Sequence, residues 1–425
     1  MKTYDIGYSH AIELAMMHLT DMPSEKRSVL EANNRVVSKD IIAKVNSPDV
    51  NASMKDGFAV ISSDIEMASP STPVELDVID IVEAGSTAKK TIKSGQTIRI
   101  LSGAPIPYGA DAVLTEEFAR VENNKIFALA DAHKGRNILF QGSDVKKDEV
   151  LIHRHTTLTP SNIALLSAGG VSQVDVYKKP KVGLLATGNE VLLIGSLPEQ
   201  GKLFASNIAL QQAWLSAFGI ETRVSISTDS FPVLSSAIQD MYSDCDVIIT
   251  SGGAWKGDRD FIIQVLDMLG WHLIFHRVRM GPGKAVGMGM LNGKPVFCLP
   301  GGPPSNEMAF LMIALPCILK MTGFQSSPFL TLYGRLDSDL QGQKQWTNFF
   351  HCLISRDKHH LVITPLPMER RLSSMAKTQA IVCIPEEMDT ISKNHIVPCC
   401  CLDIKAIRDS ISEPCLWTQK KAFFS

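Results

Sequence analysis

The chain has 425 residues, more than one ordinary hydrophobic core holds, so we expect about two to four domains. Hydrophobic residues make up 45% and charged residues 20% of the chain, which is the globular range and excludes wholesale disorder. The 42 basic and 44 acidic residues give a net charge of −2, so no overall cationic field favours nucleic acid or an anionic membrane as a partner.

The sequence also argues against a membrane span, a secretory signal and a metal-binding cysteine motif. The longest apolar stretch, at 308–319, is about a dozen residues long, whereas a spanning helix needs about 20. The first residues lead into no apolar segment. The nine cysteines include no Cys-x-x-Cys pair, and the run at 399–401 is interpreted as a half-buried strand. We therefore expect a reduced protein of the cytoplasm.

The first 150 residues predict one helix followed by a β-rich segment. Apolar residues recur at helical spacing at Ile12, Ala15, Met16 and Leu19, with Ser9 as a candidate N-cap. From residue 47 to about 150, short β-rich runs alternate with Gly, Pro and Asn turns, and no helical period appears. This segment is predicted to form a separate, mainly β lobe.

Residues 181 to 323 alternate between strand and helix patterns, as in α/β domains. The predicted strands are 182–186, 222–226, 246–250, 273–276 and 295–299, and the predicted helices are 206–218, 232–241, 259–269 and 303–321. Ser206 is a candidate N-cap, while Gly219 and Gly270 are candidate helix stops. This order predicts a mostly parallel sheet with helices on both faces. From 326 to 404 the pattern is β again, which predicts a small C-terminal β domain.

The strongest local signal is the glycine-rich loop 250–260, TSGGAWKGDRD, between an apolar strand and a helix. Backbone N–H groups of such a loop, together with a helix N-terminus, form a seat for a phosphate or another oxyanion at the carboxyl edge of the sheet. The candidate anion-binding residues are Ser251, Gly252, Gly253 and Gly257. The alternative is a tight turn whose acids cap the helix.

A second strand end carries Thr187, Gly188 and Glu190. If its strand lies close to the one before the glycine loop, Glu190, Asp258 and Asp260 converge. Mg²⁺ prefers one or two carboxylates together with substrate phosphates, so Glu190 and Asp260 are candidate metal ligands. The alternative is that the two aspartates only interact with the helix dipole.

Further candidate residues lie in three other turns. Lys284 stands in a Gly/Pro turn and could pair with an anion, and Pro300 and Gly301 begin a Pro-Gly-Gly-Pro turn ahead of a helix. In the β lobe, Asp56 and Ser102 lie in segments that read locally as turns. The chain lacks the G-x-x-x-x-G-K-[ST] phosphate motif and a correctly spaced G-x-G-x-x-G, which argues against a nucleotide-dependent oxidoreductase.

Taken in order, these motifs closely resemble the molybdopterin molybdotransferase family, which includes MoeA and the gephyrin E domain. The similarity runs from about residue 30 to 386. Residues 53–59 resemble the family motif S-x-x-D-G-[YF]-A, and 102–113 resemble [TS]-G-A-P-x-P-x-G-A-D-A-V. The segments 187–190, 251–260, 282–284 and 299–301 resemble further motifs in the family order.

The resemblance implies a multidomain α/β plus β fold. Its parts would be a linker domain from 1–46 and 147–180, an inserted β lobe at 47–146, a three-layer, MogA-like α/β molybdopterin-binding domain at 181–325, and a C-terminal β-barrel domain at 326–425. The resemblance also implies an elongated homodimer with a shared active site, in which the Asp56 lobe of one subunit faces the α/β domain of the other.

The reaction that the resemblance implies starts from adenylylated molybdopterin and molybdate, requires Mg²⁺ and releases AMP, leaving molybdenum on the dithiolene. Glu190 and Asp260 would then hold Mg²⁺. Lys284 and Ser373 would bind molybdate. Asp56 would orient the attacking water or the ribose, and Ser102 would donate to Asp56. The substrate-binding candidates are Thr187, Gly188, Ser251, Gly252, Gly253, Gly257, Asp258, Pro300 and Gly301. A molybdopterin adenylyltransferase and downstream molybdoenzymes are the implied partners.

Several positions depart from the family pattern. Ala254 and Trp255 replace Val and Ser, and Trp255 either stacks on a substrate ring or blocks the pocket. Other usual polar residues are replaced by Leu139, Ala205, Gly281 and Gly302. The leading hypothesis is a molybdotransferase. The alternative is a non-catalytic or tungstate-specific paralogue that binds molybdopterin or the finished cofactor.

Overall fold

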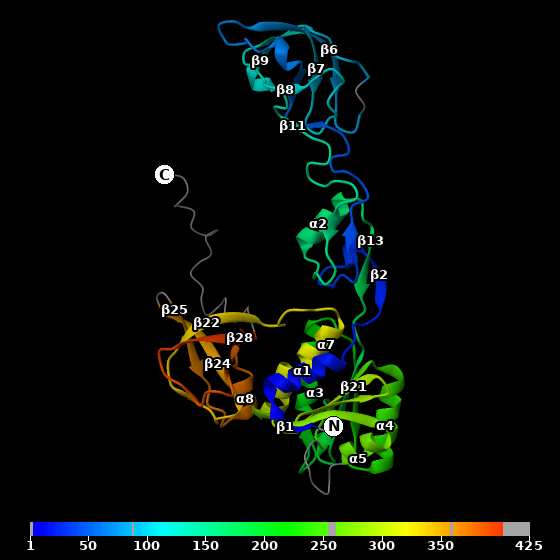
Figure 1. Cartoon of the computed structure of the whole chain (residues 1–425), viewed down its shortest axis with the longest axis vertical. Helices are drawn as coiled ribbons and strands as arrows, with labels where there is room; N and C mark the ends of the chain where they lie inside the picture. Colours follow the sequence, from blue (N-terminus) through cyan, green and yellow to red (C-terminus); the bar gives the residue numbers. More distant parts are fainter. Residues whose placement is uncertain (1–2, 87–88, 254–260, 358–359, 403–425) are drawn as a thin grey trace. The chain divides into compact units, whose positions relative to one another are not determined.

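The computed structural model describes residues 3–86, 89–253, 261–357 and 360–402 (Figure 1). The chain divides into two compact units, one of residues 24–176 and one formed by the residues on either side of that range. No helix in the described ranges is both long and apolar enough to cross a membrane.

A parallel sheet forms the centre of the first unit. Strands β17 (Thr222–Ser227), β14 (Val182–Thr187), β18 (Val247–Ser251) and β21 (Lys294–Leu299) run parallel in this order, and β20 (Gly287–Leu291) and β19 (Trp271–Gly281) extend the sheet antiparallel. The strand β14 is buried along its whole length. A strand buried on both faces reads as a continuous apolar run, which is why the sequence predicts this sheet.

Helices cover both faces of that sheet (Figure 1). The helices α1 (Tyr8–His18), α3 (Ser206–Ala217), α6 (Pro303–Ala309) and α7 (Leu315–Met321) share one core with Leu184 and Ile249. The helices α4 (Phe231–Asp244) and α5 (Phe261–Met268) share a second core with Leu185 and Ile248. Side chains that alternate along a strand thus enter opposite layers, and the predicted α/β layering is confirmed.

Three details of the helices differ from the sequence prediction. The predicted helix 303–321 contains a π-helical turn, Phe310–Ala314, between α6 and α7, next to Pro316, which offers no backbone N–H. The two predicted serine caps are wrong, because the N-cap positions are Gly7 for α1 and Ala205 for α3, and Ser9 and Ser206 already lie within the helices.

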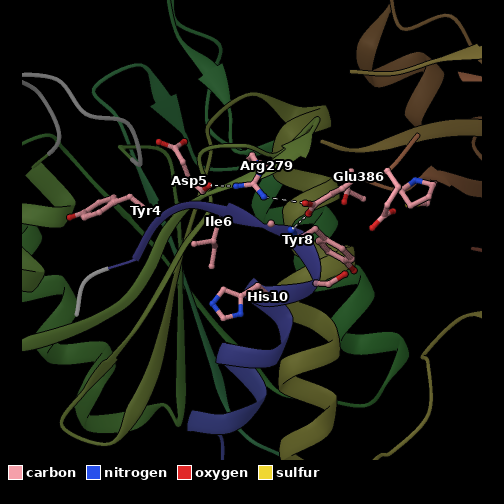
Figure 2. A pocket seen from close by; sticks show the side chains of 13 residues that line it. Tyr4, Asp5, Ile6, Tyr8, His10, Arg279 and Glu386 are labelled. Atoms are coloured by element: carbon pink, nitrogen blue, oxygen red, sulfur yellow. Dashed lines mark hydrogen bonds and ion pairs between the residues drawn. The ribbon is translucent and has the colours of Figure 1, made fainter. Parts of the chain in front are cut away.

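The N-terminal strand and helix belong to the first unit. Strand β1 (Thr3–Gly7) pairs in parallel with β19, and α1 contacts α7. The Glu386 carboxylate accepts a hydrogen bond from the Tyr8 N–H at 2.7 Å and pairs with Arg279 at 3.1 Å (Figure 2). Residues 3–23 therefore belong to the first unit, and residues 24–46 belong to the second. The sequence prediction places both segments in one linker domain. The division of the chain into four domains stays our proposal.

A closed barrel completes the first unit. Its strands β24 (Thr347–Asp357), β25 (His360–Pro365), β22 (Leu330–Leu336), β28 (Ile396–Cys401) and β26 (Ala380–Ile384) are hydrogen-bonded in this order, and β26 pairs back with β24. The short pair β23 (Leu340–Gln341) and β27 (Thr390–Ile391) and the helix α8 (Arg371–Met375) lie in its connections. The cysteine run 399–401 lies in β28, as predicted. Among the described residues, no three or more His, Cys, Asp or Glu side chains are grouped so that they could hold a metal ion.

The second unit is mainly β. A six-stranded sheet has the order β8 (Ala112–Thr115), β5 (Gly57–Val60), β7 (Gln96–Ile100), β6 (Val74–Val82), β10 (Lys125–Ala128) and β9 (Ala119–Glu122). The unit also contains three two-stranded pairings, which are β2 (Ser24–Ser28) with β13 (Gln173–Tyr177), β3 (Ile41–Ile42) with β12 (Val150–Ile152), and β4 (Ala52–Ser53) with β11 (Ile138–Leu139). The helix α2 (Pro160–Ala168) packs in a separate core with residues of β3, β12 and β13.

Candidate functional site

A cavity of about 410 Å³ opens at the carboxyl ends of β14 and β18. These strands are neighbours, and Ala186 is paired with Ser251, so the two strand ends that the sequence singles out do converge. The wall also includes the short pair β15 (Val191–Leu192) and β16 (Leu203–Phe204), the start of α3 and the first turn of α8. Thr187, Glu190, Ser251, Gly252 and Gly301, all predicted from sequence, line it.

The glycine turn after β18 is shaped by a close approach to β14. Gly252 has a φ of +102°, and a Cβ there would lie 2.7 Å from the carbonyl oxygen of Thr187. Only glycine fits this position without strain. The Gly252 N–H donates to the carbonyl of Leu299 at 3.1 Å, so it ties β18 to β21. Gly253 follows with a φ of +62°.

Part of the predicted loop falls in a range that is not described. Gly257, Asp258 and Asp260, together with Ala254 and Trp255, lie outside the described residues. The metal ligand set predicted from sequence is therefore represented in the structure by Glu190 alone.

Glu190 turns back over the end of β14. A Cβ built on Gly188, whose φ is +141°, would lie 2.7 Å from each of the two carboxylate oxygens of Glu190. The absence of a side chain at Gly188 therefore lets the carboxylate lie against the backbone at the cavity wall. Glu190 itself is exposed to solvent, so its carboxylate is open to a cation or a ligand that enters the cavity.

Thr187 contributes a buried hydroxyl to the same wall. Its Oγ1 has no hydrogen-bond partner in the described part of the chain, and the residue is only 5% exposed. Buried polar atoms are nearly always paired, and an orphan atom in a cavity wall fits a position completed by a ligand or water.

Two asparagines hold Ser251 at the end of β18. The Ser251 Oγ accepts from Asn207 Nδ2 at 3.2 Å and from Asn306 Nδ2 at 3.0 Å. A hydroxyl that accepts two hydrogen bonds still has its own proton to donate. Ser251 is therefore set up to donate to a group in the cavity.

The same asparagines fix the turn after β21. Asn207 Nδ2 donates to the Gly301 carbonyl at 2.8 Å, and Asn306 Nδ2 donates to the Pro300 carbonyl at 2.7 Å. Gln211, fully buried in α3, donates from Nε2 to Asn306 Oδ1 at 2.7 Å. Asn306 and Gln211 are not among the site residues predicted from sequence, although an amide side chain inside an apolar helix is a signal for a buried hydrogen-bond network.

Lys284 lines a second cavity, of about 350 Å³, together with Pro300 and Gly302. The Lys284 ammonium lies 4.8 Å from the ring centre of Trp346, a residue of the barrel domain, in a cation–π arrangement. Gly301 and Pro303 line the first cavity instead, so the turn at 300–303 contributes to both. Nothing in the local sequence pointed to Trp346.

Ser373 lines neither of these two cavities. It is exposed on α8, whereas Arg371 and Leu372 of the same helix line the first cavity. The next residue, Ser374, is buried and donates from Oγ to the Pro367 carbonyl at 2.6 Å. From α8, therefore, Arg371 and Leu372 line the first cavity, and the predicted Ser373 does not.

In the second unit, Asp56 and Ser102 lie together. The Ser102 backbone N–H donates to Asp56 Oδ1 at 2.6 Å. Both residues are exposed, so the carboxylate is held from one side and open on the other.

Known proteins are similar to this chain along most of its length. Residues 6–170 match the MoeA N-terminal region (domain I and II), and residues 183–320 match a probable molybdopterin binding domain. A molybdopterin molybdenumtransferase of Bacillus subtilis is 31% identical over 359 residues, which are 83% of this chain and 84% of that protein. One from Staphylococcus epidermidis is 28% identical over 388 residues, 90% of this chain and 92% of the other.

Comparison with solved structures points to the same family. Two structures of the molybdopterin biosynthesis MoeA protein of Pyrococcus horikoshii match with TM-scores of 0.82 and 0.79, at 27% and 28% identity. They cover 94% and 93% of this chain, and the chain covers 99% and 100% of them. The fold is thus the predicted multidomain one, with an α/β molybdopterin-binding domain and a C-terminal β-barrel, and the chain belongs to the MoeA family.

Proposed function

We propose that this protein is a molybdopterin molybdenumtransferase of molybdenum cofactor biosynthesis. It would insert molybdate into adenylylated molybdopterin, with Mg²⁺ present, and release AMP. The observation that carries the proposal is the cavity at the carboxyl ends of β14 and β18, which lies in the segment matching a molybdopterin binding domain. Ligands of open α/β sheets bind at this edge.

The cavity has the donors that a phosphorylated substrate needs. The Ser251 hydroxyl, held by two asparagines, and the orphan Thr187 hydroxyl can each donate to a phosphate oxygen. The Arg371 guanidinium at the rim adds the positive charge that such a group favours. These residues would bind and orient the diphosphate link between pterin and adenylate.

The Glu190 carboxylate fits the proposed metal. It is exposed at the cavity wall, and Mg²⁺ favours carboxylate and phosphate oxygens. When bound, Mg²⁺ would neutralise charge on the phosphoanhydride. Lys284 would then attract the molybdate anion at the second cavity, on the other side of the turn at 300–303.

The proposal includes a homodimer in which the partner subunit supplies the Asp56 lobe. The carboxylate of Asp56, held by the Ser102 N–H, would orient the attacking water or the ribose. Mixing two inactive variants, Asp56→Asn and Thr187→Val, tests this arrangement. If the site is shared, up to about half of the active sites in mixed dimers combine an intact Asp56 with an intact Thr187 and regain activity. If each site is built within one chain, no site regains activity.

One assay tests the function as a whole. The purified protein is incubated with adenylylated molybdopterin, molybdate and Mg²⁺, and AMP release and reconstitution of an apo-molybdoenzyme are followed. The proposal expects both, in equal amounts. Tight binding of the substrate without AMP release would instead support a non-catalytic paralogue, and AMP release with tungstate but not molybdate would support a tungstate enzyme.

A further inference from the structure

Two acid–base side chains from different domains meet inside the first unit. Glu307 lies in α6, directly after Asn306, and His351 lies in β24 of the barrel. The two residues are only 5% and 3% exposed, and Glu307 Oε2 lies 3.7 Å from His351 Nδ1. Neither residue lines the two cavities described above, and the proposed reaction does not use them.

The hydrogen bonds around His351 define which ring nitrogen carries the proton. Thr378 Oγ1 donates its single proton to the carbonyl of Ser374 at 3.0 Å. It must therefore accept at its 3.1 Å contact with His351 Nδ1, so Nδ1 carries a hydrogen. In the neutral ring Nε2 is then bare, and it has no partner among the described residues. The result is a chain from His351 through Thr378 to α8.

Burial favours the neutral form of both Glu307 and His351. Burial raises the pKa of Glu307 to about 7 and lowers the pKa of His351 to about 4, because each charged form alone is poorly solvated. A pair with one shared proton has no net charge, whether both groups are neutral or form an ion pair. The pair therefore adds no net charge to the interior in either state.

The pair is linked to two helices, α6 and α8, that hold residues of the cavity wall. On the side of α6, the neighbouring Asn306 fixes Ser251 and the Pro300 carbonyl. On the side of the barrel, the hydrogen-bond chain from His351 ends on Ser374 in α8, and the first turn of that helix brings Arg371 to the cavity. The helices α6 and α8 are in contact.

We infer that Glu307 and His351 are a positioning pair that holds α8, and with it the Arg371 guanidinium, against the cavity. The part that concerns Arg371 rests on the proposed function, because it assumes an anionic substrate there. The part that concerns α8 rests on the hydrogen-bond chain alone.

The first test uses Thr378→Val and His351→Gln, each of which interrupts the chain. Thr322→Val is the matched control, since Thr322 is also buried and its Oγ1 also donates to a helix carbonyl, that of Leu319, at 2.6 Å. We expect backbone amides of residues 371–377 to exchange with deuterium roughly tenfold faster in the two test variants and to be unchanged in the control.

A second readout reports on the ring itself. In protein labelled with ¹⁵N-histidine, the signal missing from His351→Gln belongs to His351. We expect it to report a neutral ring protonated at Nδ1, and to shift toward protonation at Nε2 in Thr378→Val. Simple packing would not move this signal. An Nε2-protonated ring in the parent, or unchanged exchange at 371–377, would overturn the inference.

The link to the substrate is tested by binding. Arg371→Met and His351→Gln should each weaken binding of adenylylated molybdopterin roughly tenfold, and the double variant should lose no more than either, since both act through one contact. If α8 and the ring respond as expected but Arg371→Met binds normally, the pair still positions α8, and the proposed role of Arg371 in the cavity is wrong.

Discussion

Asn306 uses one amide nitrogen to hold Ser251 and Pro300, at the ends of two neighbouring strands. Its Nδ2 donates to Ser251 Oγ at 3.0 Å, at the end of β18, and to the Pro300 carbonyl at 2.7 Å, after β21. The residue is 1% exposed. The distance between these two strand ends is thus set by a side chain of the helix beneath them.

We expect Asn306→Asp to weaken the connection between these two strand ends. The carboxylate has the shape of the amide but cannot donate, so the Pro300 carbonyl loses its donor and faces a second acceptor oxygen. We therefore expect the free energy of unfolding in urea to fall by about 1–3 kcal/mol and the binding of adenylylated molybdopterin to weaken. Gln212→Glu, which introduces an acid on the exposed face of α3, should unfold like the parent. Equal urea midpoints for Asn306→Asp and the parent would refute the role assigned to Asn306.

The role of Glu190 makes a separate prediction. Glu190→Gln keeps the side-chain shape but removes the charge that a divalent cation needs, so we expect the Mg²⁺ concentration for half-maximal AMP release to rise by roughly 10- to 100-fold. Glu199→Gln, an exposed change in the same connection that does not touch the cavity lining, is the control. An unchanged Mg²⁺ dependence in Glu190→Gln would remove Glu190 from the metal site.

The buried pair predicts opposite pH dependences for two variants. Between pH 4.5 and 7 the unfolded chain loses the Glu307 proton while the folded protein keeps it, so Glu307 makes stability fall as pH rises. Between pH 6.5 and 4 the unfolded chain gains a proton on His351 that the folded protein does not take up, so His351 makes stability fall as pH falls.

In the parent these two slopes oppose each other, and single variants should reveal them. From pH 4.5 to 6.5, His351→Gln should lose stability and Glu307→Gln should gain it, relative to the parent, by at most about 1.4 kcal/mol per pH unit. Urea unfolding at three pH values measures both slopes. Parallel pH curves for the parent and both variants would contradict the assigned pKa shifts.

Gly7 and Glu386 make a prediction about the start of α1. A Cβ at Gly7 would lie 2.5 Å from Glu386 Oε1, the atom that accepts from the Tyr8 N–H (Figure 2). Gly7→Ala should therefore displace this cap at a cost of about 1 kcal/mol, and adding Glu386→Ala should cost little more. Gly302→Ala, with no atom within 4 Å of its new Cβ, is the control for an added methyl. Fully additive losses would show that the two residues act independently.

Much of the fold could be predicted because its signals are local. The strand β14 is apolar throughout and buried on both faces, and glycines follow its neighbouring helices. The strand β1 could not be predicted, since it has only five residues of mixed polarity. Its position depends on pairing with β19, which lies far along the chain. For the same reason β19 is longer than the predicted 273–276, because its ends pair with β20 and β24.

The candidate site could be predicted for residues at the carboxyl ends of the parallel strands, which meet at one edge of the sheet. Thr187 and Ser251 are the last residues of two neighbouring parallel strands, so their convergence results from the topology. Trp346 and Arg371 line the cavities, and Asn306 holds Ser251, through tertiary contacts between separate elements. No spacing in the sequence encodes those contacts, and in α8 the sequence prediction names Ser373 but not Arg371.

The most direct test of the account is a crystal soaked with adenylylated molybdopterin. The account predicts electron density for the diphosphate in the cavity between β14 and β18, within hydrogen-bond distance of the Thr187 and Ser251 hydroxyls. Density for the ligand elsewhere, with this cavity filled only by water or by the protein's own side chains, would contradict it.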